Sequence, residues 1–316
     1  MMKKINDIIG DAKTIGIAGH LRPDGDCMGS CMSLYNYLKK NRPDLDVRVF
    51  LEFVDKKFNI IENTDQIITT GYDGTKFDLF ISLDTASLDR LGLNLPFYEN
   101  AKRTACIDHH ASNDGYADYN YILPKASSAS EVLYDLLDED LIDKSIAEPM
   151  YMGIAHDSGV FRFQSTTPKT MRIAANMIEK GVNVNMILEE TFFRKTYNQM
   201  MVTAKIQSEA VLALDGKCIY GYCTSEMMEE YGVTTKDLDA VVASIRNVDG
   251  VEVAMFLYQL SEDSYKVSLR SKNYVDVSKI AVANGGGGHV RAAGAEIHGE
   301  LNDIINKLLN RIKQDI

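Results

Sequence analysis

Histidine and aspartate side chains recur where apolar stretches of this chain end. The apolar runs TIGIAG, FDLFISL and RTACI, and the helical run YMGIA, are each followed by such residues. These residues are His20, Asp24, Asp26, Asp84, Asp108, His109, His110, His156 and Asp157. Imidazole and carboxylate ligands suit Mn, Fe or Zn, and carboxylates can bridge two ions. The pattern therefore predicts a metal site, and its carboxylates suit a pair of metals.

Each of these motifs has a plainer structural explanation when it is considered alone. Residues 23–26 form a good turn sequence, and a lone aspartate such as Asp84 more often caps a helix or belongs to a turn. Adjacent histidines at the end of an apolar strand, as in the triplet 108–110, have little packing reason to be there. Four of the six histidines lie at these element ends and a fifth, His289, closes a glycine run, which favours a shared chemical role.

Hydrophobic patterning indicates the elements that must position these residues. The first half alternates β-rich and helical runs, and its apolar runs lack strict alternation, as expected for parallel strands covered on both faces. The predicted strands span 14–19, 47–52, 77–84 and 103–108, and a helix is predicted over 27–41. Residues 126–191 are expected to be mostly helical. This pattern is typical of an open, mainly parallel α/β sheet, whose ligands bind outside the carboxyl ends of the strands.

The second half predicts a smaller α/β unit. The segment 192–208 lacks Gly and Pro and suits a helical connector, and two apolar runs joined at Asp215 and Gly216 predict a hairpin. The later predicted elements are a helix at 235–246, strands at 251–260 and 264–271, and a helix at 300–313. At roughly 150 residues per domain, 316 residues favour two domains. The expected divisions are a first domain at 1–190, a helical linker at 191–208 and a second domain at 209–316.

The composition argues against several classes of protein. The formal net charge is −11 and the pI is near 5.1, so a broad basic face for long duplex nucleic acid is not expected. Five cysteines without a CxxC pair do not make a disulfide framework. No apolar stretch approaches the ~18 residues that a membrane-spanning helix needs, and no signal peptide is apparent. We expect a cytoplasmic protein that binds no membrane.

A glycine run in the second half suggests a phosphate-binding loop. Glycine runs are commonly flexible loops, but this run is followed by a histidine, an arginine and a strand-like AGAEI segment. Backbone N–H groups without neighbouring side chains can approach an anion closely. Arg270, at the end of the strand-like run YKVSLR, offers bidentate phosphate recognition, although it could also be a surface charge. The predicted substrate-binding residues are Arg270, Gly286, Gly287, Gly288, His289 and Arg291.

These motifs together resemble a known family. The segments HLRPDGDCMGS (20–30), SLDT, DHHASN (108–113) and GIAHDSGVF (153–161) are similar to the four motifs of the DHH phosphoesterases. The run GGGGHVRAAG (285–294) resembles the signature of the associated DHHA1 domain. The size and motif order are those of the short, stand-alone branch of oligoribonucleases and pAp phosphatases. The departures are mild: Ser158 stands where the family often has Thr, and His156 precedes the last aspartate.

The resemblance implies a role for each motif residue. One metal would be held by His20, Asp24 and Asp84, and the other by Asp26, Asp84, His109 and Asp157. Asp84 would thus bridge two divalent ions, expected to be Mn²⁺ with Mg²⁺ or Fe²⁺ as alternatives. Asp108 would orient the histidine pair and His110 would face the substrate phosphate. His156 is not assigned to the metal set.

The expected function is two-metal hydrolysis of phosphate esters in very short nucleic acids. The substrates implied are short single-stranded RNA, the dinucleotide pApA and 3′-phosphoadenosine 5′-phosphate. A cyclic-dinucleotide phosphodiesterase is the main alternative, because it shares the same scissile chemistry. An inorganic pyrophosphatase would call for a Lys- and Arg-rich second domain rather than a GGGGH loop. An inactive nucleotide sensor would be favoured by a missing ligand, and every predicted ligand position is occupied. A homodimer is the oligomeric state that the family resemblance suggests.

Overall fold

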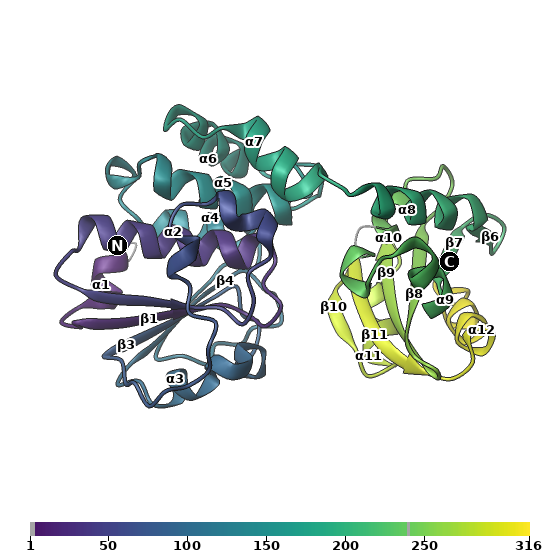
Figure 1. Cartoon of the computed structure of the whole chain (residues 1–316), viewed down its shortest axis with the longest axis horizontal. Coiled ribbons are helices and arrows are strands. Elements are labelled where there is room, and N and C mark those ends of the chain that lie inside the picture. The colour runs from purple at the N-terminus through teal and green to yellow at the C-terminus, as the bar shows by residue number, and fades with distance from the viewer. Residues whose placement is uncertain (1–3, 239–240) are drawn as a thin grey trace. The chain divides into compact units, whose positions relative to one another are not determined.

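The chain forms two compact units, each built on its own sheet (Figure 1). The computed structural model describes residues 4–238 and 241–316. The units span Met1–Arg194 and Lys195–Ile316. The α/β fold class expected from the sequence is confirmed, with an open parallel sheet first and a mixed sheet second.

The first unit contains a five-stranded sheet in which every neighbouring pair of strands is parallel. In spatial order the strands are β2 (Asp46–Phe50), β1 (Thr14–Ala18), β3 (Leu79–Leu83), β4 (Thr104–Asp108) and β5 (Tyr119–Ile122). The four strands predicted from apolar runs are confirmed. The fifth, β5, was not predicted, because its sequence YNYI alternates polar and aromatic residues at a half-buried sheet edge.

Helices cover both faces of this sheet, which explains the uninterrupted apolar strands. All five residues of β3 are buried, as expected for a strand between two helical layers. Helices α2, α4 and α5 lie on one side of the sheet and α3 on the other (Figure 1). The α-helices are α1 (Ile5–Ile9), α2 (Gly25–Asn41), α3 (Leu95–Glu99), α4 (Ala129–Leu136), α5 (Lys144–Asp157), α6 (Pro168–Glu179) and α7 (Val184–Leu188). Four 3₁₀ helices and a π-helix complete the described part of this unit: η1 (Lys56–Ile60), η2 (Thr64–Gln66), η3 (Leu88–Asn94), η4 (Glu139–Leu141) and the π-helix η5 (Glu189–Phe193).

Helices α2 and α5 cross at two glycines. A Cβ atom on Gly29 would lie 2.4 Å from the carbonyl oxygen of Pro149 and 2.8 Å from the nitrogen of Gly153. A Cβ atom on Gly153 would lie 2.1 Å from the hydroxyl of Ser130 and 2.7 Å from the carboxylate of Asp26. The two helices can approach this closely only because both positions lack a side chain. The crossing brings the end of α5 next to the start of α2.

Local capping sets the ends of these helices. Ser128 caps α4 by accepting a hydrogen bond from the N–H of Glu131. The Glu131 carboxylate accepts from the N–H and hydroxyl of Ser127 rather than completing a reciprocal capping box with Ser128. Thr167 caps α6, with Pro168 as its first residue, and Gly181 follows the end of α6 with a φ of +95°.

The segment between the units differs from the continuous helix expected over 191–208. The π-helix η5 ends at Phe193, and α8 (Tyr197–Glu209) begins four residues further on. Thr196 has an extended backbone and caps α8 in a reciprocal box with Gln199, so the helix starts anew there. The absence of Gly and Pro did not reveal this break, because it is made by a capping threonine and not by a helix-breaking residue. Helix α8 belongs to the second unit.

The second unit is a mixed six-stranded sheet with helices on both faces. In spatial order its strands are β10 (Gly287–His289), β11 (Ala292–His298), β9 (Ser264–Ser271), β8 (Val253–Ser261), β7 (Cys218–Cys223) and β6 (Val211–Ala213). Only the β7–β8 pair is parallel among these. The helices after α8 are α9 (Ser225–Tyr231), the 3₁₀ helix η6 (Thr235–Asp237), α10 (Val241–Ile245), α11 (Val277–Val282) and α12 (Leu301–Ile312).

The hairpin and the final helix of this unit match their sequence signals. Asp215 and Gly216 both have positive φ, and the N–H of Lys217 bonds the carbonyl of Leu214, as a tight turn between β6 and β7 requires. Helix α12 coincides with the predicted amphipathic helix. The helix predicted over 235–246 is instead divided into η6 and α10, with residues 239–240 outside the described part.

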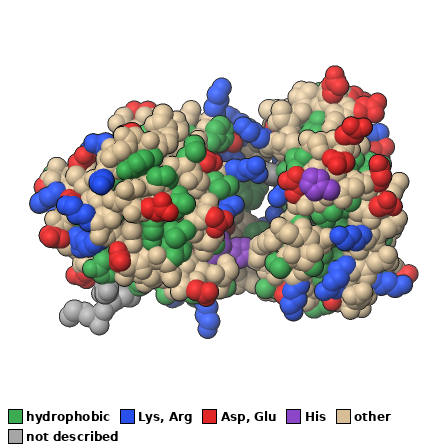
Figure 2. All heavy atoms as spheres, turned by 90° about the horizontal axis from the view of Figure 1, so that it is seen from below, with side chains coloured by type: hydrophobic (Ala, Val, Ile, Leu, Met, Phe, Trp, Pro, Cys, Tyr) green, Lys and Arg blue, Asp and Glu red, His purple; other side chains and the backbone are tan. Residues whose placement is uncertain are grey.

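Two surface properties bear on function. Across the described ranges, the structure contains no helix that is long and apolar enough to cross a membrane. On the face shown in Figure 2, acidic and basic side chains are interspersed over the first unit rather than gathered into a basic surface.

The glycine crossing leads to a prediction about stability. Replacing Gly29 by Ala favours the helix intrinsically by about 1 kcal/mol, but the added methyl meets backbone atoms that cannot move aside. We expect a net loss of roughly 1–3 kcal/mol in the free energy of unfolding, measured by urea denaturation followed by circular dichroism. The control is Gly71→Ala, whose Cβ makes only ordinary contacts, the nearest at 3.7 Å, and which should change stability by less than about 0.5 kcal/mol. Equal stability of the two variants would contradict the tight crossing.

Candidate metal centre

Three adjacent strands deliver imidazole and carboxylate groups to one edge of the first sheet. Strands β1, β3 and β4 are neighbours and run parallel. Their carboxyl ends are followed or closed by His20, Asp84 and the triplet Asp108–His110, respectively. Parallel strands end at a common edge, so these side chains meet although they are far apart in sequence.

Two helix ends complete the cluster. Asp24 caps the N-terminus of α2, and its carboxylate accepts hydrogen bonds from the N–H groups of Asp26 and Cys27. Asp157 is the last residue of α5, and the crossing of α2 and α5 brings it to the same place. Within the described residues, three groups have ligand atoms within 4.8 Å of one another: His20 with Asp24 and Asp84, Asp26 with His109 and Asp157, and Asp84 with Asp108, His109 and His110. Together they contain all six residues that the sequence nominated as metal ligands.

The distances indicate that Asp84 is the centre of the cluster. One carboxylate oxygen, Oδ2, lies 3.4 Å from Nε2 of His20, and the other, Oδ1, lies 3.5 Å from Nε2 of His109. Nε2 of His20 also lies 3.7 Å from Oδ1 of Asp24, and Nε2 of His109 lies 3.1 Å from Oδ2 of Asp157. Asp84 is thus the residue that touches both histidines. It is the only one of the nominated ligands with a positive φ, +52°, a strained conformation of the kind that collects at functional sites.

The environment of the Oδ1 atom of Asp84 indicates whether the cluster can accommodate a metal ion. This atom is buried and accepts no hydrogen bond from the described residues. Leaving a carboxylate oxygen buried without a donor is costly unless a cation takes its place. Hard and borderline divalent cations accept this combination of carboxylate and imidazole groups. The residues present therefore fit a metal, with Asp84 able to contact two ions.

Backbone groups at the start of α4 hold Asp26, a feature that the sequence did not reveal. The N–H of Ala129 donates to Asp26 Oδ2 at 2.5 Å, and the N–H of Ser130 donates to Oδ1 at 3.0 Å. Both oxygens of the carboxylate are therefore oriented by the positive end of a helix. Ser128 caps the start of this helix, but nothing local in the sequence indicates which distant carboxylate accepts hydrogen bonds from its first N–H groups.

Crowded carboxylates and burial shift the pKa values of the cluster. Burial, and secondly the charge of Asp84, raises the pKa of Asp26 to about 7. Burial raises the pKa of Asp157 well above its usual value. For His109 burial opposes the charged form, but Asp84 and Asp157 outweigh it and raise the pKa to about 10. In His20, too, burial opposes the charged form, and interactions that include the carboxylates of Asp24 and Asp84 raise the pKa despite it.

Asp108 is placed behind the cluster and orients His110. Its Oδ1 accepts from Nδ1 of His110 at 2.8 Å, and its Oδ2 accepts from the side-chain amide of Asn113 at 2.7 Å. Burial works to raise the pKa of Asp108, but the hydrogen bond from His110 outweighs it and the pKa lies below the usual value. Asn113, within the quoted DHHASN segment, was not singled out from the sequence as a functional residue. Its amide orients the Asp108 carboxylate, which in turn orients His110.

His156 precedes Asp157 but, among the described residues, belongs to none of the groups of possible metal ligands. Its Nε2 hydrogen bonds to the hydroxyl of Thr191 at 2.9 Å, and its ring contacts the rings of Phe58 and Phe192. Burial, followed by the positive charge of Lys57, lowers the pKa of His156 to about 4. The ring is therefore neutral near pH 7.

In the second unit, one row across three strands contains two of the predicted substrate-binding residues. Arg270 on β9 pairs with Ala292 on β11, and Ala292 pairs with His289 on β10. Residues directly opposite one another share a face of the sheet, so Arg270 and His289 stand on the same face. Gly287 pairs with Gly294 on that face as well, and a Cβ atom at 287 would meet nothing within 4 Å.

The remaining predicted substrate-binding residues have structural tasks. A Cβ atom on Gly286 would lie 2.1 Å from the carbonyl oxygen of Gly294, and one on Gly288 would lie 2.5 Å from that of Ala292. These two glycines let β10 approach β11. The guanidinium of Arg291 donates to the main-chain carbonyls of Val275 and Asn273, so it secures the loop after β9.

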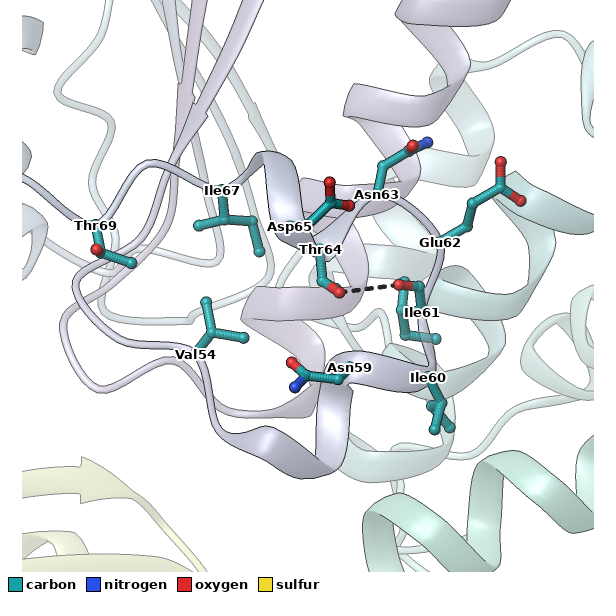
Figure 3. A pocket seen from close by; sticks show the side chains of 10 residues that line it. All are labelled: Val54, Asn59, Ile60, Ile61, Glu62, Asn63, Thr64, Asp65, Ile67 and Thr69. Carbon is teal, nitrogen blue, oxygen red and sulfur yellow. Dashed lines mark hydrogen bonds between the residues drawn. The ribbon is translucent and has the colours of Figure 1, made fainter.

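A separate cavity of about 670 Å³ lies in the first unit. It is formed by residues between 54 and 69, including the 3₁₀ helices η1 and η2 (Figure 3). In this view the Thr64 hydroxyl donates to the carbonyl of Ile61. None of the nominated metal ligands lines the cavity, so it is distinct from the cluster.

Comparison with known proteins matches the two units of this chain to two family models and the whole chain to relatives of nearly the same length. Residues 14–154 match the model of the DHH family, N-terminal domain, and residues 215–315 match that of the DHHA1 domain. The chain is 31% identical over 313 residues to the bifunctional oligoribonuclease and PAP phosphatase NrnA of Thermus thermophilus, covering 96% of this chain and 90% of the relative. It is 27% identical over 290 residues to the protein of the same name from Bacillus subtilis, covering 90% of each.

A solved structure confirms that the fold extends over the whole chain. An exopolyphosphatase-related protein from Bacteroides fragilis superposes with a TM-score of 0.89 at 22% identity, covering 98% of this chain and 95% of that one. At that identity the likeness concerns the fold. The two matched domains and the relatives of nearly the same length show the family. This chain belongs to the DHH family, and its own DHH domain is followed by a DHHA1 domain.

Proposed function

We propose that this protein is a metal-dependent phosphoesterase that hydrolyses short oligoribonucleotides, such as pApA, and 3′-phosphoadenosine 5′-phosphate. The observation that carries the proposal is the convergence of His20, Asp84 and the triplet 108–110 at adjacent strand ends, with a buried Asp84 oxygen that accepts no hydrogen bond from the described residues. Relatives of nearly the same length are named for these two activities, which supports the choice of substrates.

The first unit contributes the hydrolytic chemistry in this proposal. His20, Asp24 and Asp84 would hold one divalent ion, and Asp26, Asp84, His109 and Asp157 the other. When bound, such a pair lowers the pKa of water and screens the charge that develops on phosphate. We propose Mn²⁺ as the native metal, because the ligand set mixes imidazole with carboxylate.

The Asp108–His110 pair would donate a proton to the substrate or accept one from it. Nδ1 of His110 donates to Asp108, so Nε2 is the nitrogen that can exchange a proton with the phosphate or the leaving group. Asp108 keeps this tautomer in place and stabilises the ring when it becomes charged. The amide of Asn113 holds Asp108 in the orientation that this requires.

The second unit would bind the substrate phosphates. Arg270 and His289 share a face of the sheet, and the bare backbone at Gly287 allows an anion to approach N–H groups on that face. In this proposal Gly286, Gly288 and Arg291 support the site through their backbone packing and hydrogen bonds. The formal charge of −11 favours substrates with few phosphates over long duplex nucleic acid. Five free, buried cysteines support a reducing compartment, and we propose the cytoplasm.

A substrate panel tests the activity directly. The purified protein with Mn²⁺ is incubated with pApA, 5-mer and 24-mer RNA, 3′-phosphoadenosine 5′-phosphate, cyclic di-AMP and pyrophosphate. We expect turnover of pApA, the 5-mer and the phosphoadenosine phosphate, and much slower turnover of the other three. Faster hydrolysis of cyclic di-AMP than of pApA would favour a cyclic-dinucleotide phosphodiesterase. A protein that turns over none of the nucleotides refutes the proposal.

Removing the central carboxylate tests the metal chemistry. Asp84→Ala should lower kcat by at least about a thousandfold, because metal activation contributes several kcal/mol and each 1.4 kcal/mol is tenfold in rate. Circular dichroism should show an intact fold. The matched control is Asp140→Ala, which removes an exposed aspartate on η4 and should leave turnover unchanged. Retained activity in Asp84→Ala would refute the bridging role.

Substitutions in the second unit test substrate binding. Arg270→Ala and His289→Ala should each raise KM for pApA about tenfold or more with a smaller change in kcat, because charge-assisted hydrogen bonds to phosphate are lost. Lys307→Ala removes an exposed cation from α12, which packs on the other face of the same sheet, and should leave KM unchanged. If both test variants keep the wild-type KM, the phosphates bind elsewhere.

A further inference from the structure

His156 is the one histidine at the metal-binding motifs that has no role in the proposed metal and phosphate chemistry. It precedes the nominated ligand Asp157 at the end of α5, and its ring lies against the turn that begins α2. A Cβ atom on Gly25 would lie 2.1 Å from Cγ and 2.3 Å from Nδ1 of His156. The ring therefore occupies the space that a side chain between Asp24 and Asp26 would fill.

The two hydrogen bonds of the Thr191 hydroxyl show which nitrogen of the His156 ring carries a proton. The hydroxyl of Thr191 donates its one proton to the carbonyl of Ile187, at 2.7 Å. The same hydroxyl oxygen lies 2.9 Å from Nε2 of His156. Because that hydroxyl has no second proton, Nε2 must donate to it. Thr191 is only 3% exposed, so this donor would be left buried and unsatisfied if the hydroxyl were removed.

Aromatic contacts fix the plane of the same ring. The ring centroid of His156 lies 6.0 Å from that of Phe58 in η1 and 5.3 Å from that of Phe192, which meets it edge to face. Phe192 and Thr191 both belong to the π-helix η5, whose wide turn is closed by the N–H of Arg194 bonding the carbonyl of Glu189 at 2.8 Å. Arg194 is the last residue of the first unit. The ring thus joins the α2 turn, the end of α5 and the final element of this unit.

We propose that His156 is a positioning residue for the metal centre: held by Thr191 and packed on Gly25, it fixes the Asp24–Asp26 turn relative to Asp157. Asp24 and Asp26 come from the start of α2, whereas Asp157 comes from the end of α5. The His156 ring lies between the start of α2 and the end of α5 and sets the distance between them. The relative positions of Asp24, Asp26 and Asp157 depend on that distance. Residues that orient metal ligands typically affect metal affinity by 10–100-fold. The inference rests on the proposed metal site and not on the substrate.

The test removes the acceptor and keeps the shape. Thr191→Val is nearly isosteric but leaves Nε2–H of His156 without its partner. We expect the dissociation constant for Mn²⁺, measured by titration calorimetry on the full chain without substrate, to rise about tenfold. Thr191→Ser retains the hydroxyl and should restore the wild-type affinity. His156→Phe, which fills the space but cannot donate, should weaken Mn²⁺ binding similarly, and adding Thr191→Val to it should cause no further loss.

A matched control separates positioning from general stability. Thr203 on α8 donates its hydroxyl to the carbonyl four residues earlier, at 2.6 Å, as Thr191 does. Thr203→Val therefore makes the same chemical change in the second unit and should leave the Mn²⁺ affinity unaltered. Wild-type affinity in both Thr191→Val and His156→Phe, with altered unfolding temperatures only, would overturn the proposal. A wild-type protein that binds no Mn²⁺ would instead refute the metal site itself.

Discussion

Repulsion among buried carboxylates is the constraint on which the first unit depends. Asp26 and the partly buried Asp157 approach the buried Asp84 at an edge of the sheet, and like charges that lie close together disfavour ionisation. Burial, together with this repulsion, raises the pKa values of Asp26 and Asp157. His20 and His109 compensate for part of it, and their own pKa values are raised in return. A site of this kind is stable with all carboxylates ionised only when strong positive charge lies among them.

The fold supplies several devices that hold the carboxylates together against this repulsion. The N-terminus of α4 gives Asp26 two backbone donors, and Gly29 and Gly153 let α2 and α5 approach closely enough to bring Asp157 alongside. The ring of His156 fills the remaining space over Gly25. Each device uses backbone or neutral groups, so none competes with a metal for the ligands. The ligands are thereby positioned by packing that does not depend on the ion.

The sequence predicted the parts of the site that lie on continuous local patterns. Apolar runs followed by histidine or aspartate located His20, Asp84 and the 108–110 triplet, because a parallel sheet gathers strand ends at one edge. The contact of Asp26 with the start of α4, and of His156 with Thr191, could not be predicted, because they join segments 103 and 35 residues apart. The helix break at Thr196 and the edge strand β5 were missed because local signals for them are weak or ambiguous. The hairpin at Asp215 was clear because the turn chemistry is local.

We expect the cluster around Asp84 to bind two divalent cations. The most direct measurement is the stoichiometry of Mn²⁺ on the purified full chain, by titration calorimetry repeated in buffers of different ionisation enthalpy. The chain should bind two ions, and protons should be released on binding because His20 and His109 must give up their protons to act as ligands. Binding of fewer than two ions per chain, or binding of two ions without proton release, would contradict this expectation.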